Sequence, residues 1–378
     1  MPTKGGTAVW FDEVYQRLGD HSTHVITAKV PDSELHDRTH SNTIHRMRLR
    51  HSKWIRPASL PVYAKFFLMA LGLGIRNKFE QIHAGRVLPE GWVAVRVAKI
   101  LRLPVIIYAH GEEITTWRRS ARRLKAMTAA YRAADRVIAN SQFTRDRLIE
   151  LGVDATRIAL INPGVDLGRF FPGQEADDLR AQICQTPSDK MLLSVGRLSR
   201  RKGFDQVIQS LPALQARGLD VHYAIIGIGE DDDYLRSLAR ELQISDRVHF
   251  LGHVSPENLP RWYCAADLFV MPNRAIDGDT EGFGMVFVEA AACGKTSLAG
   301  ESGGTGAAVL HEKTGLRVPG DDLNAIENAL IRLLEDDQLR SKLAGAACTR
   351  AHAELGWTSV AERTSGLRLG GWASESRS

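Results

Sequence analysis

Two glutamates separated by a glycine-rich segment, Glu281 and Glu289, form the stretch of this sequence whose residue types best suit chemistry. Gly282 and Gly284 lie between them and let a backbone approach a ligand closely. The residues after Gly284 are predicted to begin a helix, whose first N–H groups lack partners and can bind an anion. Glu289 falls inside that apolar helix, where a carboxylate is costly unless it has a partner. Two interpretations stay open: a ribose diol donates hydroxyl groups to Glu289, or the protein itself satisfies one buried, salt-bridged Glu.

Cations in residues 196–203 form a second constellation. Arg197 directly follows the apolar run at 192–195, and Lys202 precedes the next predicted helix. Two cations beside free helix amides suit a diphosphate. A solvated basic loop is the alternative and the commoner origin of such a cluster. The position at the end of a predicted strand favours the phosphate site.

The loops that carry these residues need a scaffold, and the apolar pattern indicates a layered α/β scaffold. Short apolar runs alternate with amphipathic stretches, and helical patterns occupy 90–102, 120–134 and 141–151. The runs predicted as buried strands are 25–28, 105–108, 137–139, 158–161, 192–195, 223–226, 248–251, 268–271 and 297–299. Such repetition implies parallel sheets with helices on both faces and ligands beyond the carboxyl ends of the strands. We therefore expect two doubly wound, Rossmann-like domains facing a cleft.

Length and charge indicate how the chain divides. Its 378 residues exceed what one core usually serves, and the Pro- and Gly-rich segment 162–173 separates the two series of runs. We expect domains at 1–170 and 171–350, followed by a segment at 351–378 that can cross back to the first domain. Residues 1–170 hold 27 Lys and Arg against 15 Asp and Glu, whereas the remainder holds 22 against 29. The net charge of +5 therefore hides a basic and an acidic half, which suggests different partners.

Further motifs follow one another along nearly the whole chain. Together with the glutamate and cation loops, they make the chain resemble the family-4 retaining glycosyltransferases of the GT-B fold. Each motif alone is weak, and their order and spacing together carry the resemblance. The segments 110–113 and 162–166 are most similar to those of phosphatidylinositol mannoside mannosyltransferases. This similarity favours GDP-mannose as the donor. The further motifs are 109–113, 139–141, 163–166, 226–229 and 302–304.

The resemblance implies that a hexose passes from a nucleotide diphosphate sugar, held mainly by the second domain, to a glycan or lipid-linked acceptor held mainly by the first. Arg197 and Lys202 would neutralise the diphosphate, which becomes the leaving group. Glu289 would hold the ribose hydroxyls. Cations already in place on the diphosphate stabilise the transition state more than the ground state. No cofactor is expected.

Sugar contacts are implied for both domains. Glu281 and the backbone of Phe283 and Gly284 would hold the sugar hydroxyls near the reacting carbon. His110, from the first domain, would reach across the cleft to the transferred sugar. No convincing second carboxylate offers itself as a nucleophile, so same-face attack, usually proposed for this family, is the favoured route to retention. Relatives often carry Pro-Glu where this chain has 305–308, and a proline where it has 295–296, and both segments are expected to lie near the sugar pocket.

The N-terminus departs from the pattern of the family. Gly5 and Gly6 would bring backbone amides close to the diphosphate or the acceptor. Relatives begin with a hydrophobic strand before this loop, whereas Met1 already lies inside it. We expect that the physiological protein has about ten further residues, roughly a strand and its approach.

Metal chemistry is not expected. Asp277-Gly278-Asp279 matches the D-x-D of metal-dependent glycosyltransferases of another fold, but a solvated turn is the favoured interpretation. The four cysteines, Cys184, Cys264, Cys293 and Cys348, lie far apart without a CxxC pair. This spacing argues against a disulfide framework or a zinc site and fits a reducing cytoplasm. Cys293 is most simply a small buried residue at a helix end.

Basic residues interleaved with tryptophan mark the first domain. They occupy 46–56 and 117–125, close to an apolar helix at 62–75. Such segments suit an anionic membrane surface or a polyanionic acceptor, and a plain solvated face is the alternative. No recognised nucleic-acid module appears. The expected location is the cytoplasm, with peripheral binding to the inner face of the membrane as an option.

Other functions share this fold and its phosphate chemistry. A sugar phosphorylase would depend on orthophosphate, and a nucleotide-sugar epimerase would act without an acceptor. A non-catalytic protein would bind the donor without slowly hydrolysing it. The sequence alone leaves these alternatives to experiment.

Overall fold

The computed structural model describes residues 5–31, 33–48 and 60–367 and divides the chain into two compact units. Unit 1 contains Met1–Pro163 and Trp357–Ser378, and unit 2 contains Gly164–Gly356. The boundaries lie at 163/164 and 356/357, beside the expected 170 and 350. The amide of Val165 donates to the carbonyl of Leu355 at 2.8 Å, so the two chain passages at the boundary of unit 2 are hydrogen-bonded to each other.

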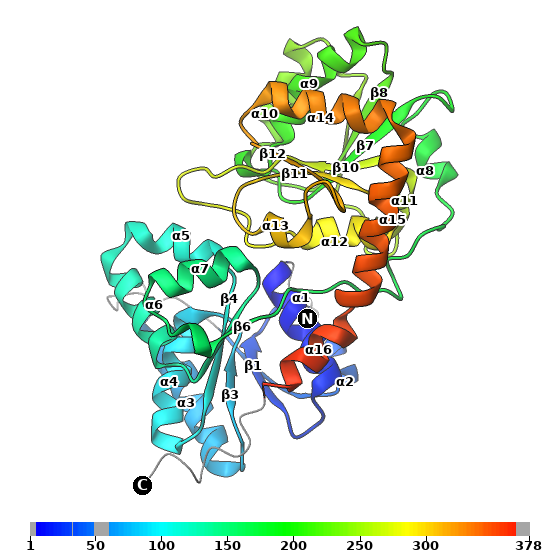
Figure 1. Ribbon diagram of the computed structural model, residues 1–378. Coiled ribbons are helices and arrows are strands. Elements are labelled where there is room, and N and C mark those ends of the chain that lie inside the picture. The colour runs from blue at the N-terminus through cyan, green and yellow to red at the C-terminus, as the bar shows by residue number, and fades with distance from the viewer. Residues whose placement is uncertain (1–4, 32, 49–59, 368–378) are drawn as a thin grey trace. The chain divides into compact units, whose positions relative to one another are not determined.

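Unit 2 is built on one six-stranded parallel sheet (Figure 1), in the order β12-β11-β10-β7-β8-β9. Its strands are β7 (Lys190–Val195), β8 (Val221–Ile226), β9 (Val248–Gly252), β10 (Leu268–Met271), β11 (Ser297–Gly300) and β12 (Gly315–Val318). Its helices are α8 (Asp177–Ala181), α9 (Phe204–Ala216), α10 (Asp232–Glu241), α11 (Leu259–Ala265), α12 (Met285–Ala292), α13 (Thr305–Ala308), α14 (Leu323–Glu335) and α15 (Asp337–Glu354), with a single turn η4 (Arg200–Lys202).

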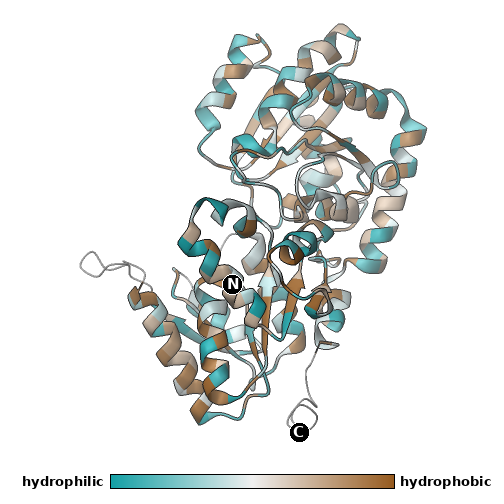
Figure 2. Ribbon diagram, turned by 60° about the vertical axis from the view of Figure 1, so that its left-hand side comes forward, coloured by the Kyte–Doolittle hydropathy of each residue, from teal (hydrophilic) through white to brown (hydrophobic). Residues whose placement is uncertain are grey.

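Both faces of this sheet are covered, as expected. Along β7, Met191 and Leu193 belong to one apolar cluster and Leu192 to another, because successive side chains of a strand point to opposite faces. The first cluster packs against α11, α12 and α15, and the second against α9 and α14. Figure 2 shows apolar residues gathered along the strands.

Unit 1 contains two parallel sheets in its described part: β1-β2, and β3-β4-β5-β6. The strands are β1 (His24–Ala28), β2 (Thr43–Met47), β3 (Ile82–Ala84), β4 (Val105–Ala109), β5 (Arg136–Ala139) and β6 (Ile158–Leu160). The helices are α1 (Gly6–Leu18), α2 (Ser33–Thr39), α3 (Leu60–Arg76), α4 (Trp92–Leu101), α5 (Glu112–Thr116), α6 (Ala121–Ala133), α7 (Gln142–Glu150) and α16 (Trp357–Ser365), with short turns η1 (Val87–Gly91), η2 (Trp117–Arg119) and η3 (Ala155–Arg157). The helices predicted at 90–102, 120–134 and 141–151 are confirmed as α4, α6 and α7.

Helix α1 packs on the face of the larger unit 1 sheet to which Tyr108 of β4 points. Trp10 and Tyr15 are buried on this helix, and the Trp10 ring meets that of Tyr108 edge-on at 5.0 Å between centroids. The hydroxyl of Tyr15 is hydrogen-bonded to that of Tyr108 at 3.1 Å. Helix α16 packs against α1, so the chain returns to unit 1 after unit 2. The expected strand before Met1 stays a prediction.

Candidate active site

The carboxyl ends of β7 and β10 lie side by side at the centre of the unit 2 sheet. From β7 the chain runs outward through β8 to β9, and it then returns to the other side of β7 as β10. Open parallel sheets bind ligands at such a reversal of strand order. The loops that leave this point, 196–203 and 272–284, are those in which the sequence predicted the cations and the first glutamate.

Glycines let the loops after β7 and β8 pack backbone against backbone. A Cβ on Gly227 would lie 1.8 Å from the carbonyl oxygen of Gly196, and a Cβ on Gly229 would lie 2.3 Å from that of Leu198. Both distances are far below any real contact. The glycines of 226–229 therefore serve the packing of these two loops.

Glu281 is buried and paired with two cations of the β7 loop. Its Oε2 accepts hydrogen bonds from Nζ of Lys202 and, at 3.0 Å, from Nη1 of Arg201. Burial alone raises the pKa of Glu281, but the charges of Lys202 and Arg201 outweigh it and hold that pKa below its ordinary value. The two cations share the Glu281 carboxylate, and Arg201 also faces the Asp279 carboxylate, so two negative charges balance the two positive ones. Lys202 and Glu281, expected on diphosphate and sugar respectively, bind each other in this structure.

Arg201 is a residue of this site that the sequence analysis passed over. Besides Glu281, it is paired with Asp279 at 3.0 Å between Nε and Oδ2. The signal was present in the run of three basic residues on η4, but only the fold turns Arg201 toward the β10 loop. We name Glu281, Arg201 and Lys202 the carboxylate–cation cluster.

Arg197 lies outside this cluster. Its side chain is 75% exposed, and its Nε is 2.9 Å from Oε2 of Glu230. An exposed ion pair of this kind contributes about 0–1 kcal/mol. Arg197 can therefore exchange Glu230 for a ligand phosphate at little cost.

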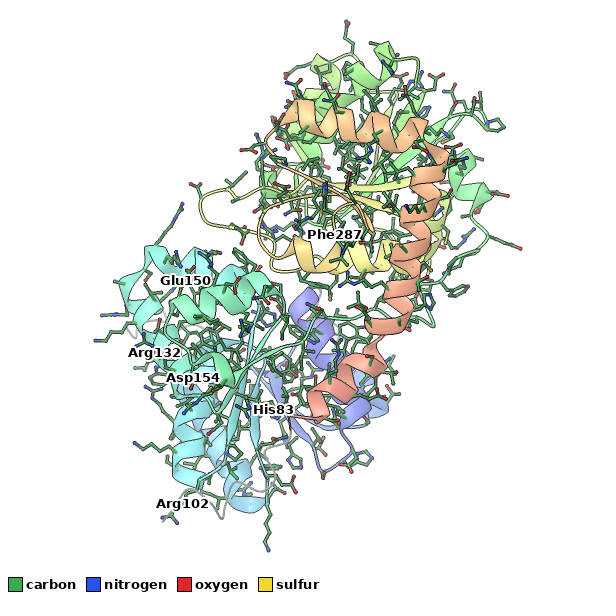
Figure 3. The ribbon with its side chains drawn as sticks, in the orientation of Figure 1. His83, Arg102, Arg132, Glu150, Asp154 and Phe287 are labelled. Carbon is green, nitrogen blue, oxygen red and sulfur yellow. The ribbon has the colours of Figure 1, made fainter. Side chains whose placement is uncertain are left out.

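Helix α12 begins beside the carboxylate–cation cluster. Its N-cap, Gly284, has φ +87°, and a Cβ there would lie 2.6 Å from the ring of Phe287, which Figure 3 labels. Phe283, whose backbone was expected to contact the sugar, buries its side chain in the core. The amide of Gly304 donates to the carbonyl of Glu281 at 2.7 Å, which fixes the approach to the helix. The helix start adds positive potential to the cationic cluster.

Glu289 has a protein partner of a kind the sequence did not predict. The hydroxyl of Tyr263, on α11, donates to Oε2 of Glu289 at 2.8 Å. Burial raises the pKa of Glu289, and the bond from Tyr263 offsets part of that rise. The partner is thus a tyrosine hydroxyl rather than the cation of a salt bridge, and the ribose role stays a prediction.

The loop before Glu281 is held by further residues that sequence reasoning missed. Arg274 is paired with buried Asp205 at 2.6 Å. Asn273 is buried, donates to the carbonyl of Ser302 at 3.1 Å and accepts the amide of Gly300 at 3.2 Å. These contacts tie the β10 loop to α9 and to the end of β11.

The two departures from the family pattern lie at opposite edges of the sheet. Residues 305–308 form α13, and the hydroxyl of Thr305 donates to the carbonyl of Gly300 at 2.6 Å, at the carboxyl end of β11. Residues 295–296 precede β11 and lie at its amino end. The expectation that both adjoin a sugar pocket was therefore wrong for 295–296, because the direction of the strand places them at the far edge.

The Asp277–Asp279 segment forms a tight turn. Ile276 and Asp279 exchange backbone hydrogen bonds at 3.1 and 2.8 Å, and Asp277 has φ +54°. Because the Asp279 carboxylate is paired with Arg201, this turn has the geometry favoured from the sequence.

Among the described residues, Asp12, His36 and His40 form the cluster whose side chains have the composition of a metal site. Nε2 of His36 and of His40 lie 3.3 and 3.1 Å from the two carboxylate oxygens of Asp12. The Nδ1 of His40 accepts the amide of Asn42 at 3.1 Å, so the neutral His40 ring carries its proton on Nε2 and donates it to Asp12. A metal ion on that nitrogen would require this proton to leave. The cluster is better explained as hydrogen bonding between α1 and the end of α2.

His110 follows β4 in unit 1 and is held on several sides. Its Nε2 lies 2.7 Å from the carbonyl oxygen of Gly85, which only accepts, so Nε2 carries the proton. Its amide donates to Glu113 at 3.0 Å, and its ring meets Trp10 edge-on. The neutral ring therefore has an unprotonated Nδ1 that can accept a hydrogen bond. Its expected role on the sugar stays a prediction.

Gly5 and Gly6 are exposed at the start of α1. Gly5 is the N-cap with φ +140°, and the helix N–H groups of Ala8 and Val9 turn back to its carbonyl at 3.1 and 3.2 Å. Their proposed approach to diphosphate or acceptor is untested.

Comparison with known proteins decides the family. The model for "Glycosyl transferases group 1" matches residues 176–350, and that for "Glycosyltransferase Family 4" matches residues 4–169. A GDP-mannose-dependent monoacylated alpha-(1-6)-phosphatidylinositol monomannoside mannosyltransferase of Corynebacterium glutamicum is 30% identical over 83% of this chain and 82% of its own length. The chain belongs to the family-4 glycosyltransferases. It is also 28% identical to a GDP-mannose-dependent alpha-(1-6)-phosphatidylinositol monomannoside mannosyltransferase of Mycolicibacterium smegmatis, over 97% of this chain and 94% of that one.

A solved structure supports the fold of this glycosyltransferase. The Anabaena protein HepE, crystallised with UDP, matches with a TM-score of 0.81 at 22% identity, covering 97% of this chain and 96% of its own. The glycosyltransferase therefore has the α/β architecture of the GT-B enzymes, with a parallel sheet in each of its two units. The resemblance deduced from the motifs is confirmed.

Proposed function

We propose that this glycosyltransferase transfers mannose from GDP-mannose to a lipid-linked or glycan acceptor, with retention at the anomeric carbon and without a metal ion. The observation that carries the proposal is the carboxylate–cation cluster beside the start of α12 at the reversal of strand order. Its two cations, Arg201 and Lys202, are of the type that binds a leaving diphosphate. The names of the two mannosyltransferases above support GDP-mannose as the donor and a phosphoinositide glycolipid as the class of acceptor.

Charge neutralisation on the diphosphate comes from the protein in this proposal. Lys202 and Arg201 move from Glu281 toward the phosphate oxygens, and Arg197 exchanges Glu230 for the same ligand. As the sugar–phosphate bond breaks, these cations meet the charge that develops on the departing oxygen. Glu281, freed of part of its pairing, accepts hydrogen bonds from the sugar hydroxyls.

Retention in this proposal proceeds by same-face attack, and Glu281 binds the sugar hydroxyls rather than acting as a nucleophile. Same-face attack needs no enzyme nucleophile, because the leaving phosphate accepts the proton of the acceptor hydroxyl. The His110 Nδ1 accepts a hydrogen bond from the transferred sugar.

Donor hydrolysis in the absence of acceptor tests the proposal. UDP-, GDP- and ADP-sugars are incubated separately with the full chain and excess chelator, with or without added manganese. GDP-mannose is expected to be hydrolysed faster than the other nucleotide sugars. The rate of mannose release should not change when manganese is added. Preference for another nucleotide would overturn the donor assignment, and strict dependence on manganese would restore Asp277 and Asp279 as candidate ligands.

Membrane binding through one face of unit 1 is the second part of the proposal. Among the described residues, no helix has the length and apolarity to cross a bilayer. Exposed Leu68 and Ile75 lie on α3, and exposed Ile100 lies on α4, which packs against α3 and α6. The same two helices, the C-cap of α4 and helix α6 also carry exposed basic residues, at Lys65, Arg76, Lys99, Arg102, Arg122, Arg123 and Lys125. Exposed apolar and basic side chains on helices that pack together suit an anionic lipid surface, at the inner face of the membrane in our proposal.

Some of the basic residues that the sequence placed in the two basic runs form ion pairs within the protein. Arg46 is paired with Asp37 at 2.6 Å and is mostly buried, so its predicted membrane role was wrong. Residues 49–59, with the rest of that basic run, lie outside the described residues. Arg118 is paired with Glu150 at 2.8 Å.

A further inference from the structure

Two cysteines that are distant in sequence are neighbours in unit 2. Cys264 lies on α11, and Cys293 caps the end of α12. The sulfur of Cys293 is 3.8 Å from the carbonyl oxygen of Pro260, one helical turn before Cys264, so the Cys293 thiol lies against the turn of α11 that carries Cys264. The sequence spacing had argued against a disulfide, but the packing of α11 against α12 brings the pair together.

Cys264 is the accessible member of the pair. It lines a surface pocket of about 360 Å³, together with Lys295, Arg180, Asp267 and the segment 173–177. Cys293 is buried behind it, 2% exposed. A small polar reagent entering the pocket therefore meets Cys264 first and Cys293 only through it.

The surroundings of Cys264 favour its thiolate. The neighbouring Cys293 thiol, the amides of Gln174 and Gly173 and the positive charge of the Lys295 ammonium stabilise the anion, so the pKa of Cys264 lies well below its usual value. The pKa of Cys293 is raised, because it keeps the proton that the pair shares and is buried. The thiolate is the reactive form of cysteine.

This pair sits directly beside the Tyr263–Glu289 hydrogen bond. Tyr263 precedes Cys264 on α11, and Glu289 lies one turn before Cys293 on α12, where its carbonyl accepts the Cys293 amide at 3.1 Å. A covalent link between the cysteines would therefore constrain the two helix segments that position Glu289.

We propose that Cys264 and Cys293 form an oxidation-sensitive pair that a hydroperoxide converts to a disulfide, and that this lowers donor affinity through Glu289. The Cys264 thiolate attacks one peroxide oxygen, the O–O bond breaks, hydroxide leaves and a sulfenic acid forms. The Cys293 sulfur then attacks the sulfenic sulfur, and the proton of Cys293 leaves with the hydroxyl group as water. The hydroperoxide gains the two electrons that the thiols lose. The effect on the donor rests on the proposed function, whereas the disulfide does not.

Mass spectrometry of the full chain tests the disulfide. The protein is treated with hydrogen peroxide, its remaining thiols are alkylated, and its peptides are mapped. A Cys264–Cys293 cross-link is expected, with Cys184 and Cys348 still alkylated as internal controls. In Cys293→Ser, a dimedone adduct should accumulate on Cys264; in Cys264→Ser, Cys293 should resist oxidation. Oxidation of Cys184 or Cys348 as fast as Cys264, or no cross-link, would overturn the proposal.

Binding of GDP to oxidised and reduced protein tests the consequence. Oxidation should weaken GDP by about fivefold or more, the lower end of usual coupling between sites, and a thiol reductant should restore binding. Cys264→Ser should bind GDP normally and be indifferent to peroxide. A cross-link without any change in GDP affinity would leave the oxidation site standing and refute its link to the donor. Failure of the reduced protein to bind any nucleotide diphosphate would instead count against the proposed function.

Discussion

At the scale of single residues, the candidate site shows how burial makes a charged group depend on its neighbours. The carboxylate of Glu281 is buried together with Arg201 and Lys202, and each charge compensates the cost of burying the other. Removing one member of a buried ion pair is costly, about 3–5 kcal/mol, because the other charge stays behind. The cluster therefore ties the phosphate-binding proposal to the stability of unit 2.

The first prediction concerns the phosphate contacts. Lys202→Ala and Arg201→Ala should each weaken GDP binding by about 1.5–3 kcal/mol, the range for hydrogen bonds to charged groups, whereas guanosine binding should barely change. Calorimetry with both ligands measures the difference. Arg236→Ala is the matched control, because Arg236 forms an exposed pair with Asp232 on α10. Equal losses for GDP and guanosine would refute the phosphate assignment.

The second prediction concerns Glu289 and pH. Its pKa is raised in the folded chain, so folding holds the proton more tightly and this carboxyl costs stability as pH rises through the unfolded pKa, near 4.3. Glu289→Gln keeps an acceptor for Tyr263 without the charge. At pH below about 4, the variant and the native chain should have the same free energy of unfolding. Above the unfolded pKa, the variant should become increasingly more stable than the native chain as pH rises. Denaturant unfolding across pH measures this.

Ligand binding gives Glu289→Gln an independent readout. If Glu289 holds the ribose, the variant should weaken GDP and guanosine alike. A variant that is stabilised at neutral pH and yet binds both ligands normally would show that Glu289 does not contact the ribose and has only a structural role in α12.

At the scale of elements, loops rather than helices decide the shape of the donor edge. The third prediction is that Gly227→Ala destabilises unit 2 by about 3 kcal/mol or more, because the added Cβ would meet the Gly196 carbonyl at a position with φ +148°. Gly218→Ala is the control: its φ is +83° but its surroundings are open, so only the backbone term of about 1 kcal/mol remains. Thermal unfolding compares them. Similar losses would show that the close approach is relieved by a shift of the loop.

At the scale of the whole molecule, the basic half and the acidic half are expected to meet different partners. The fourth prediction is that the protein sediments with anionic phosphatidylglycerol vesicles at low salt and is released as salt screens the attraction. Leu68→Ser/Ile75→Ser should lower the vesicle partition coefficient by about a hundredfold or more, because burying each of the two side chains contributes about 1.5–3 kcal/mol. Leu35→Ser, exposed on α2, is the control. Equal binding to neutral vesicles, or no binding, would favour a solvated face.

The sequence by itself determined the α/β class, the presence of parallel sheets in both units and the family. Apolar runs of strand length, such as 192–195 and 268–271, and the glycine and charge motifs after them are local properties of the chain. Because the carboxyl ends of parallel strands share one edge, it also followed that the cation loop and the Glu281 loop would approach each other.

Only the tertiary structure decided which side chains face one another. Strand order made Arg201 a partner of Glu281, the packing of α11 on α12 set Tyr263 against Glu289 and Cys264 against Cys293, and strand direction sent 295–296 to the far edge. Sequence spacing contains none of these pairings, because contacts between elements depend on how helices and strands pack rather than on their separation along the chain.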